Sequence, residues 1–199
     1  MASRPPMPDQ VTLQCVPSKE GGVLRFAYQV ANRSPGDVYL LDVLPTVDAT
    51  GKHAVADISA GYATWLIGTT AVIDKGIAPL PADRQVFPRR VPLGCRIAPG
   101  QAVDRRLDIP LPLAERNPYY GDLPLKDYEE REVTAVRFVV QFLRATVDGF
   151  GAEPSRFGEG LFLVYGSNTA AQAETLATTF PTRGLVMLRR GDAFPRPAL

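Results

Sequence analysis

The sequence predicts an all-β protein, and three observations lead to this fold class. Apolar residues recur at every second position in several short stretches, most clearly at Leu24, Phe26, Tyr28 and Val30. Glycine- and proline-containing turns separate these stretches, which is typical of a sandwich or a barrel. The 199 residues include 19 prolines, which remove backbone donors and so exclude a mostly helical fold. We therefore expect about nine short strands in an antiparallel β-sandwich, with long loops and at most one or two short helices.

The first strands follow directly from their patterns. Residues 11–16 are predicted as a half-buried strand because their apolar side chains fall at every second position. Residues 19–22 form a turn, and residues 24–31 carry the cleanest alternation in the chain. Residues 32–37 are dense in turn-forming side chains. We expect the strands on either side of that turn, 24–31 and 38–44, to pair as a hairpin.

The middle of the chain is predicted to alternate between inserts and short strands. Residues 45–64 show no regular pattern, and residues 79–92 contain several prolines, so both are expected to be loops. The expected strands are 65–73, a shorter piece near Ile77, 94–97 and 102–113.

One of these strands contains two prolines. Apolar residues fall at every second position from Leu107 to Leu113, but Pro110 and Pro112 occupy positions between them. Proline cannot donate to a sheet ladder, so it is confined largely to edge strands. We therefore predict that residues 106–113 form an edge strand whose apolar face packs inward and whose prolines limit unwanted pairing. The following loop is expected to leave the sheet edge toward solvent.

The second half of the chain is dominated by one apolar segment. Residues 132–147 carry apolar side chains on both faces, which indicates a central strand. A helix is the competing interpretation, because an acidic run could supply its N-terminus, but the β-branched and aromatic content favours a strand. The remaining predictions are a glycine-rich loop over 149–160, a strand over 161–165, a short helix over 169–176 capped by Asn168, a strand over 184–190 and a tail over 194–199.

The sequence predicts one folded domain. We assign 1–10 to a flexible N-terminal segment, 11–190 to a single β-sandwich domain and 191–199 to a tail. The domain carries inserts at about 45–92 and 114–131, and no internal repeat or domain linker interrupts it.

Two segments resemble bacterial immunoglobulin-like domains. FAYQVANRSPGDVYLLDV, residues 26–43, is similar to the strand, V-x-N-x-S turn and strand of such domains. IAPGQAVDRRLDI, residues 97–109, resembles their Pro-Gly-polar turn and outgoing strand. The Cys…Trp…Cys spacing of antibody domains is absent. The resemblance implies an immunoglobulin-like β-sandwich, and it implies no activity, because such folds host many functions.

Charge and composition exclude some classes of partner. Lys and Arg total 22 against 21 for Asp and Glu, a net charge of +1, whereas nucleic-acid-binding domains carry a basic patch or stripe. No apolar run reaches about 18 residues, so we predict no membrane span. The start of the chain lacks the apolar region of a secretory signal. We expect a cytoplasmic protein, or a periplasmic or secreted one if a leader has been removed.

The two cysteines, Cys15 and Cys95, are expected to be buried and reduced, since free cysteine is among the most buried residue types. A disulfide between them stays open as the alternative. They do not form a zinc site, which needs several soft ligands.

The sequence shows no complete catalytic or metal-binding set, and no cofactor is expected. A Ser-His-Asp or Cys-His arrangement would have to use His53, the only histidine, whose loop context indicates an exposed structural residue. Residues 149–160 contain glycines but not the order of a phosphate-binding loop. Residues 32–34 match the N-glycosylation pattern, which has weight only in an exported protein.

An acidic run is the remaining place for chemistry. Its carboxylates could bind calcium or serve a glycosidase, but their spacing matches no EF-hand loop, and a solvated charged surface is the preferred interpretation. The run comprises Asp122, Asp127, Glu129, Glu130 and Glu132.

Recognition by loops is what the sequence favours. Tyrosines in loops suit interfaces because they join a rigid apolar ring to a polar tip. The residues predicted to bind a partner are Pro118, Tyr119, Tyr120, Tyr128 and Trp65. Two alternatives stay open: a tyrosine ring packs back over the end of the sandwich, and the segment around Trp65 belongs to the core.

The sequence therefore predicts a non-enzymatic binding or assembly module that presents loops on a β-sandwich to a protein partner or to a second copy of itself in a homo-oligomer. The alternative is a hydrolase or carbohydrate-active protein that uses the acidic loop residues.

Overall fold

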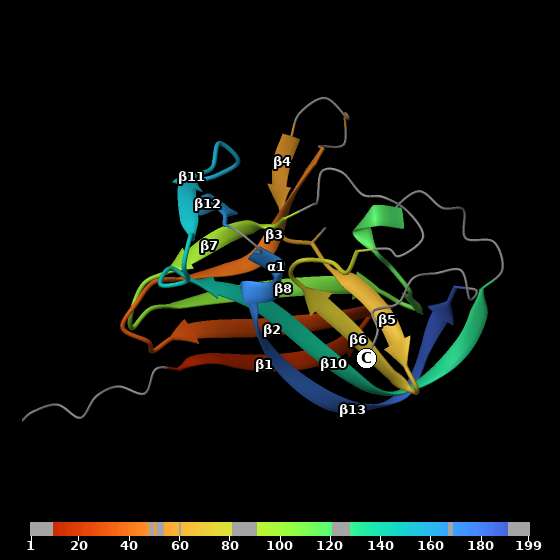
Figure 1. The fold of residues 1–199 in the computed structure, drawn as a ribbon. Coiled ribbons are helices and arrows are strands. Elements are labelled where there is room, and N and C mark those ends of the chain that lie inside the picture. The colour runs from red at the N-terminus through yellow and green to blue at the C-terminus, as the bar shows by residue number, and fades with distance from the viewer. Residues whose placement is uncertain are drawn as a thin grey trace, which may run out of the picture.

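Thirteen strands, one 3-10 helix and one short α-helix make up the described part of the chain (Figure 1). This computed structural model describes residues 10–47, 50, 54–59, 61–80, 91–120, 128–166 and 169–190. The first strands are β1 (Val11–Glu20), β2 (Val23–Asn32), β3 (Val38–Val47), β4 (Ala54–Asp57), β5 (Ala63–Ile67), β6 (Thr70–Lys75) and β7 (Leu93–Ile97). The later elements are β8 (Ala102–Pro110), β9 (Leu113–Ala114), η1 (Pro118–Tyr120), β10 (Glu129–Arg144), β11 (Gly151–Pro154), β12 (Leu161–Tyr165), α1 (Thr169–Gln172) and β13 (Glu174–Arg189).

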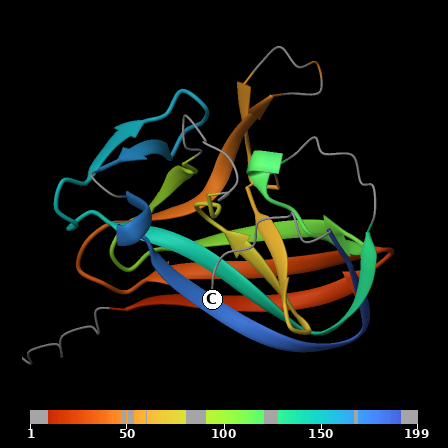
Figure 2. The ribbon, with the colours of Figure 1, turned by 45° about the vertical axis from the view of Figure 1, so that its right-hand side comes forward.

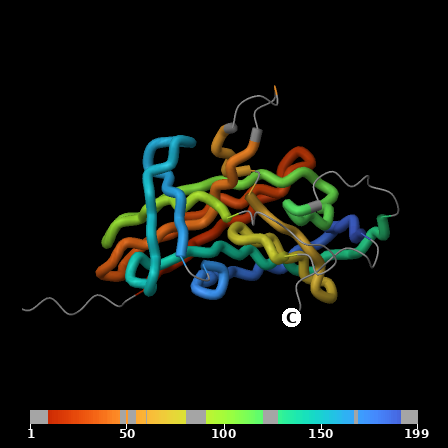
Figure 3. Tube along the Cα trace, turned by 45° about the horizontal axis from the view of Figure 1, so that its top comes forward, coloured from red at the N-terminus to blue at the C-terminus, as the bar shows by residue number. Residues whose placement is uncertain are grey.

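The strands form two sheets that pack face to face (Figure 2). The smaller sheet has the order β1-β2-β8, and its pairs are antiparallel. The larger sheet follows the path β11-β12-β7-β3-β10-β13-β9, while β6 pairs with β10 and β5, and β4 pairs with β3. Figure 3 shows that the hairpins β11–β12 and β5–β6 lie at opposite ends of the molecule.

The main core lies between the two sheets and is built from the predicted alternation. Leu24, Phe26, Tyr28 and Val30 of β2 are all buried. The ring of Phe26 stacks on Phe138 of β10 with ring centroids 4.8 Å apart. Burying one large apolar side chain contributes about 1.5–3 kcal/mol, so this shared core is the main attraction between the sheets.

The predicted all-β sandwich is confirmed. The strands outnumber the expected nine because the predicted loops 45–64 and 149–160 contain β4, the start of β5 and β11. Two pairings are parallel rather than antiparallel, namely β10 with β6 and β13 with β9. Membership of the immunoglobulin-like class and the division into domain, inserts and tails stay predictions.

The apolar segment after the acidic run is a central strand, as predicted. β10 pairs with β13 along one side, and with β6 and then β3 along the other. Its two apolar faces are both used, because Phe138 packs into the main core while Val139 belongs to a second cluster on the outer face. The competing helical interpretation is wrong.

The predicted hairpin of the second and third strands is also wrong. β2 pairs with β1 and β8, whereas β3 pairs with strands of the larger sheet, so the chain crosses between sheets here. Asn32 holds this crossing: it is 0% exposed, and its Nδ2 donates to the carbonyls of Gly36 and Ile97 at 2.8 Å each. Its Oδ1 accepts from Ser34. Because this amide is buried and fully engaged, it is not presented for glycosylation.

The C-terminal strand is longer than predicted. β13 begins at Glu174 rather than near residue 184, and α1 covers only the first part of the helix expected over 169–176. The first half of β13 pairs with β10, so tertiary pairing overrides the helix propensity of this Ala-containing segment. Asn168, the predicted cap, lies outside the described residues.

β8 is an edge strand, as predicted, and among the described strands it pairs only with β2. The predicted strand over 106–113 is too long, however, because β8 ends at Pro110 and Leu113 belongs to β9 of the larger sheet. Pro110 and Pro112 are exposed, while Ile109 and Leu113 are buried. The apolar face therefore packs inward and the prolines face solvent, which protects this edge from further pairing.

Beyond β8 the chain enters the larger sheet and closes a ring of strands. β9 pairs with β13, and Arg116 bridges Thr64 of β5; β5 then pairs with β6, β6 with β10, and β10 with β13. Glu115, 1% exposed, accepts the backbone N–H groups of Leu66 at 3.4 Å and Arg190 at 2.9 Å. We call this ring the closed end. The expectation that the chain here leaves toward solvent is therefore wrong.

Within the described residues, no helix is long and apolar enough to cross a membrane, since α1 has only four residues.

Candidate functional site

A cluster of polar side chains lies inside the sandwich. Asp42 of β3 is 0% exposed, and its Oδ2 accepts hydrogen bonds from the Tyr28 hydroxyl at 3.0 Å and from Arg105 Nε at 3.1 Å. Arg105 of β8 also donates to Cys95 Sγ of β7 at 3.0 Å. Hydrogen bonds to charged groups stabilise more than neutral ones, so this cluster ties strands of the two sheets together.

Burial sets the protonation of this cluster. Desolvation and the charge of Asp42 raise the pKa of Tyr28 well above its usual range. Lys75 of β6 is 0% exposed and donates to the backbone carbonyl of Ile58; burial lowers its pKa to about 8, against the opposing charges of Asp42 and Asp57. A lysine with a lowered pKa beside an aspartate is common in active sites. Here, however, neither Lys75 nor Asp42 lines any of the four hollows described below, although Tyr28 and Arg105 line the third of them. Because the lysine and the aspartate are both 0% exposed, we interpret the cluster as a polar part of the core.

Two of the predicted partner-binding residues come together, but in a small core. Trp65 of β5 is 8% exposed and packs with Val72 and Val139 on the outer face of the larger sheet, and Tyr119 of η1 packs against the same cluster. The Tyr119 backbone N–H donates to Asn117 Oδ1 at 3.0 Å. The structure therefore shows both open alternatives: a tyrosine packs back over the sandwich, and Trp65 belongs to a core.

The other predicted partner-binding residues do not gather into one surface. Pro118 is half-buried at the start of η1, and the side chain of Tyr120 lies outside the described part. Tyr128 is half-buried, and its hydroxyl makes no hydrogen bond to any described residue. Partner binding by these residues stays a prediction.

A segment after β6, residues 76–80, is held to the outer face of the larger sheet by Gln141. The side chain of Gln141 donates from Nε2 to both carboxylate oxygens of Asp74 at 3.0 Å each. Its Oε1 accepts a hydrogen bond from the Ile77 N–H at 3.1 Å. Gly76 lies so close that an added Cβ would come within 2.4 Å of Gln141 Cδ. Burial raises the pKa of Asp74 to about 7, although the hydrogen bond from Gln141 opposes this shift.

The acidic residues that the structure describes form no enclosed catalytic site. Glu129, Glu130 and Glu132 are exposed on β10, and Glu129 pairs with Arg131 at 2.5 Å. Glu132 and Arg131 line an open hollow of about 470 Å³ together with Arg189. No group of three or more His, Cys, Asp or Glu in the described ranges could hold a metal ion. The predicted residues His53, Asp122 and Asp127 lie outside those ranges.

Cys15 and Cys95 are free, in agreement with the predicted reduced state, but each is half-buried rather than buried as predicted. They lie in different sheets. Burial raises the pKa of Cys15 to about 12 and also raises the pKa of Cys95. Since the thiolate is the reactive form, neither thiol is prepared for nucleophilic chemistry.

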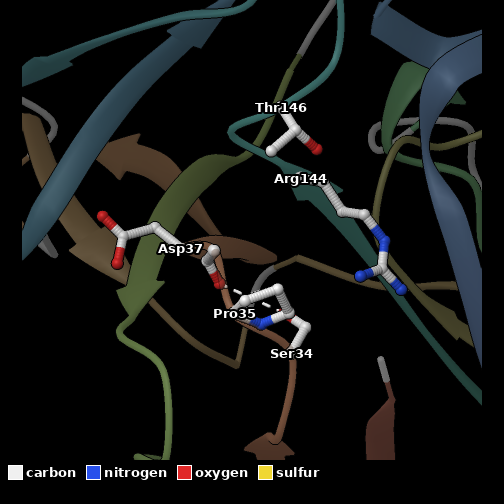
Figure 4. A pocket seen from close by; sticks show the side chains of 6 residues that line it. Ser34, Pro35, Asp37, Arg144 and Thr146 are labelled. Atoms are coloured by element: carbon white, nitrogen blue, oxygen red, sulfur yellow. Dashed lines mark hydrogen bonds between the residues drawn. The ribbon is translucent and has the colours of Figure 1, made fainter. Parts of the chain in front are cut away.

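A small hollow lies beside the crossing between β2 and β3 (Figure 4). Its volume is about 60 Å³, which is room for a few water molecules. Its charged groups are already paired, Asp37 with Arg96 at 2.7 Å and Arg144 with Glu174 at 2.5 Å. A third hollow, of about 260 Å³, is a shallow dent on the outer face of the smaller sheet beside Val16.

The fourth hollow lies between β1, an edge strand of the smaller sheet, and β13 of the larger sheet. It has a volume of about 170 Å³, and its walls include the core side chains Phe26 and Val136 and the half-buried Phe180. We call it the flank pocket. Its lining residues are Pro17, Ser18, Lys19, Leu24, Phe26, Val136, Phe180, Pro181 and Thr182. Three residues of the main core, Leu24, Phe26 and Val136, line this hollow, which is more than line any of the other three.

A bulge in β13 lies at the rim of the flank pocket. Val133 of β10 pairs with Leu185, but Ala135 pairs with Pro181, so β13 has extra residues between these two pairs. Gly184 within the bulge has a φ of 62°, a conformation that favours glycine. Bulges bend a strand and redirect its side chains, and they are frequent beside functional sites.

β13 also presents a free edge beside the flank pocket. Its second edge pairs with β9 only at Met187 and Leu188, and no charged residue occurs over 175–182. Proteins commonly protect such edges with charges, prolines or short length. β8 has Pro110 and alternating charges, and β11 has four residues, whereas the long edge of β13 has only Pro181.

The sequence prediction missed this flank because it assigned 169–176 to a helix and began the last strand near residue 184. The pattern that could have revealed it is the alternation of Leu176, Thr178 and Phe180 in a run rich in threonine, which favours a strand.

Together, the fold and the site define an all-β sandwich protein with a polar cluster in its core and an open flank, made of a free strand edge beside an apolar pocket. No family model, curated protein or solved structure matches this chain.

Proposed function

We propose that this protein is a non-enzymatic binding module that takes up an extended segment of a protein partner on the flank between β1 and β13. The partner segment adds a strand to the free edge of β13. In this mode of recognition, main-chain hydrogen bonds supply affinity and a pocket for a side chain supplies specificity. The observation that carries the proposal is the long, uncharged free edge of β13 over 175–182, directly beside the flank pocket.

The flank has better support as a binding surface than the loops predicted from the sequence. Trp65 is buried, and Tyr119 packs against the same outer cluster. Much of their apolar area is therefore covered by the protein itself and does not face a partner. The edge of β13, in contrast, has backbone groups that no described strand pairs with.

The alternative of a hydrolase or carbohydrate-active protein has less support. Such chemistry needs two carboxylates at a fixed separation, one of them with a raised pKa. The described members of the acidic run, Glu129, Glu130 and Glu132, are exposed along one strand. No observation on the described residues favours this function over peptide binding.

The experiment uses random peptides displayed on phage as the probe, selected on the full chain. A selected peptide is then synthesised, and its affinity is measured for two matched lysine variants. Ala177→Lys places a charge on the free edge of β13, and Ala102→Lys places one at an equally exposed position of the protected edge strand β8. We expect Ala177→Lys to weaken binding about ten-fold and Ala102→Lys to leave it unchanged, because an edge lysine disfavours strand addition.

Backbone amide exchange with and without the peptide locates the contact. Protection of β13 over 175–182 supports the proposal. Unchanged affinity for Ala177→Lys, or protection centred on η1 together with loss of binding in Tyr119→Ala, would contradict it and favour the loop surface instead.

A further inference from the structure

We infer that the flank pocket recognises a large apolar side chain that lies next to a carboxylate on the partner segment. This inference rests on the proposed function, because it names the chemistry of the segment that adds to β13. The flank pocket supplies the apolar part of the recognition, and Lys19 at its rim supplies the charged part.

The size and lining of the flank pocket fit one large apolar group. A cavity of about 150 Å³ lined by apolar side chains holds a benzene molecule, and the flank pocket measures about 170 Å³. Phe26 and Val136 belong to the main core, and Phe180 packs against it. A ring or branched chain in this pocket would therefore contact the core directly and shield the half-buried Phe180 from water.

The charge at the rim selects a carboxylate. Lys19 is the one charged residue among the described residues that line the flank pocket. It is exposed and uses one donor on the carbonyl of Gly184 at 3.3 Å, and an ammonium group has three donors. The bond to Gly184 places the ammonium group beside the bulge of β13, so its remaining donors lie near the pocket rim, and no described carboxylate lines the pocket.

Lys19 is therefore expected to set which apolar segments bind the flank more tightly. A segment with a carboxylate beside its apolar side chain gains an ion pair, whereas one with an ammonium group in the same place is repelled. An exposed ion pair contributes little free energy, so the preference is expected to be modest and to weaken as salt is added.

Three small probes with the same ring and chain length test this inference: phenylpropionate, phenylpropanol and phenylpropylamine. Each is titrated into the full chain, and the affinity and the affected backbone amides are measured by NMR. We expect the carboxylate to bind about five-fold more tightly than the amine, with the alcohol between them, as an exposed charge interaction allows. The amides that shift should be those of the residues lining the flank pocket.

Four variants separate the contributions. Lys19→Met should remove the order of the three probes, while Arg183→Met, which removes an exposed charge next to the pocket but outside its lining, should preserve it. Thr182→Phe should block all three probes by filling the pocket. Ala177→Lys should leave all three unaffected, because the probes carry no backbone that could pair with β13.

The inference is overturned if none of the probes shifts the pocket amides, if the carboxylate and the amine bind equally, or if the preference survives Lys19→Met. It is also overturned if Thr182→Phe leaves binding intact. If the probes behave as expected but no peptide protects the edge of β13, the flank pocket keeps its assigned chemistry and the strand-addition function fails.

Discussion

The closed end and the open flank are made from the same strand, β13, but they treat its free edge in opposite ways. At the closed end, β9 pairs with β13 at Met187 and Leu188, and Glu115 accepts a backbone N–H from each side of the ring. At the open flank, the same edge of β13 has no strand partner in the described chain, and β1 lies across from it, tied by Lys19.

The two regions also differ in how their aromatic side chains are packed. At the closed end, Trp65 and Tyr119 pack on Val139 and stabilise the fold. On the open flank, Phe180 packs on the core but lines a pocket that solvent can enter. Trp65 and Tyr119 therefore contribute to stability, and the proposed recognition surface is an edge strand that carries none of the residues predicted to bind a partner.

The largest effect is expected from breaking the cluster at the closed end. Trp65→Ala should lower the free energy of unfolding by about 3–5 kcal/mol, because it removes a buried ring and leaves a cavity. Urea denaturation followed by circular dichroism measures this loss. A change below about 1 kcal/mol, the level typical of an exposed residue, would show that Trp65 is not part of a core.

The polar cluster in the core gives the next largest effect. Arg105→Met removes the cation that hydrogen-bonds Asp42 and should cost about 3 kcal/mol, because it breaks a buried ion pair by removing one partner. Lys75→Met is the comparison: burial already opposes the charged form of Lys75, so its loss should cost less than Arg105→Met in the same denaturation assay. The reverse order would contradict this account of the cluster.

A pH effect tests the segment that Asp74 and Gln141 hold to the outer face. The folded pKa of Asp74, about 7, lies above the ordinary aspartate value of 3.8, so between these values the folded state binds the proton more strongly than the unfolded state. Stability should therefore fall as pH rises from about 4 to 7, by at most about 1.4 kcal/mol per unit. Asp74→Asn should remove this part of the pH dependence in urea titrations, and the exposed Asp104→Asn should retain it.

The smallest effect on stability is expected on the open flank. Phe180 is half-buried, so Phe180→Ala should cost about 1–2 kcal/mol, less than Trp65→Ala. The same change should abolish phenylpropionate binding, since it removes a wall of the flank pocket. Trp65→Ala, in contrast, should lower stability more than Phe180→Ala but should leave phenylpropionate binding unchanged in the protein that remains folded. Equal phenylpropionate binding by wild type and Phe180→Ala would contradict the claim that Phe180 forms a wall of the binding pocket on the open flank.

Much of the fold could be predicted because local patterns agree with it. The alternation at Leu24 to Val30 and the two apolar faces of β10 gave correct strands, and Pro110 correctly marked an edge. The crossing at Asn32 could not be predicted, because a turn sequence does not say which sheet receives the next strand.

The candidate site could not be predicted for related reasons. The flank pocket joins β1, β2, β10 and β13, which only the tertiary fold brings together. The start of β13 was predicted as a helix because its alanines favour one locally, while the apolar strand β10 supplies a ladder that outweighs that preference. Lys19 was predicted only as a turn residue, since its position at a pocket rim depends on the bulge near Gly184.

The most direct test of the central claim is amide hydrogen exchange along β13, measured with and without a peptide selected on the full chain. We predict that the peptide slows exchange over residues 175–182 and leaves residues 187–188, already paired with β9, unchanged. Protection at η1 or elsewhere, with exchange over 175–182 unaltered, would contradict the assignment of the open flank as the recognition surface.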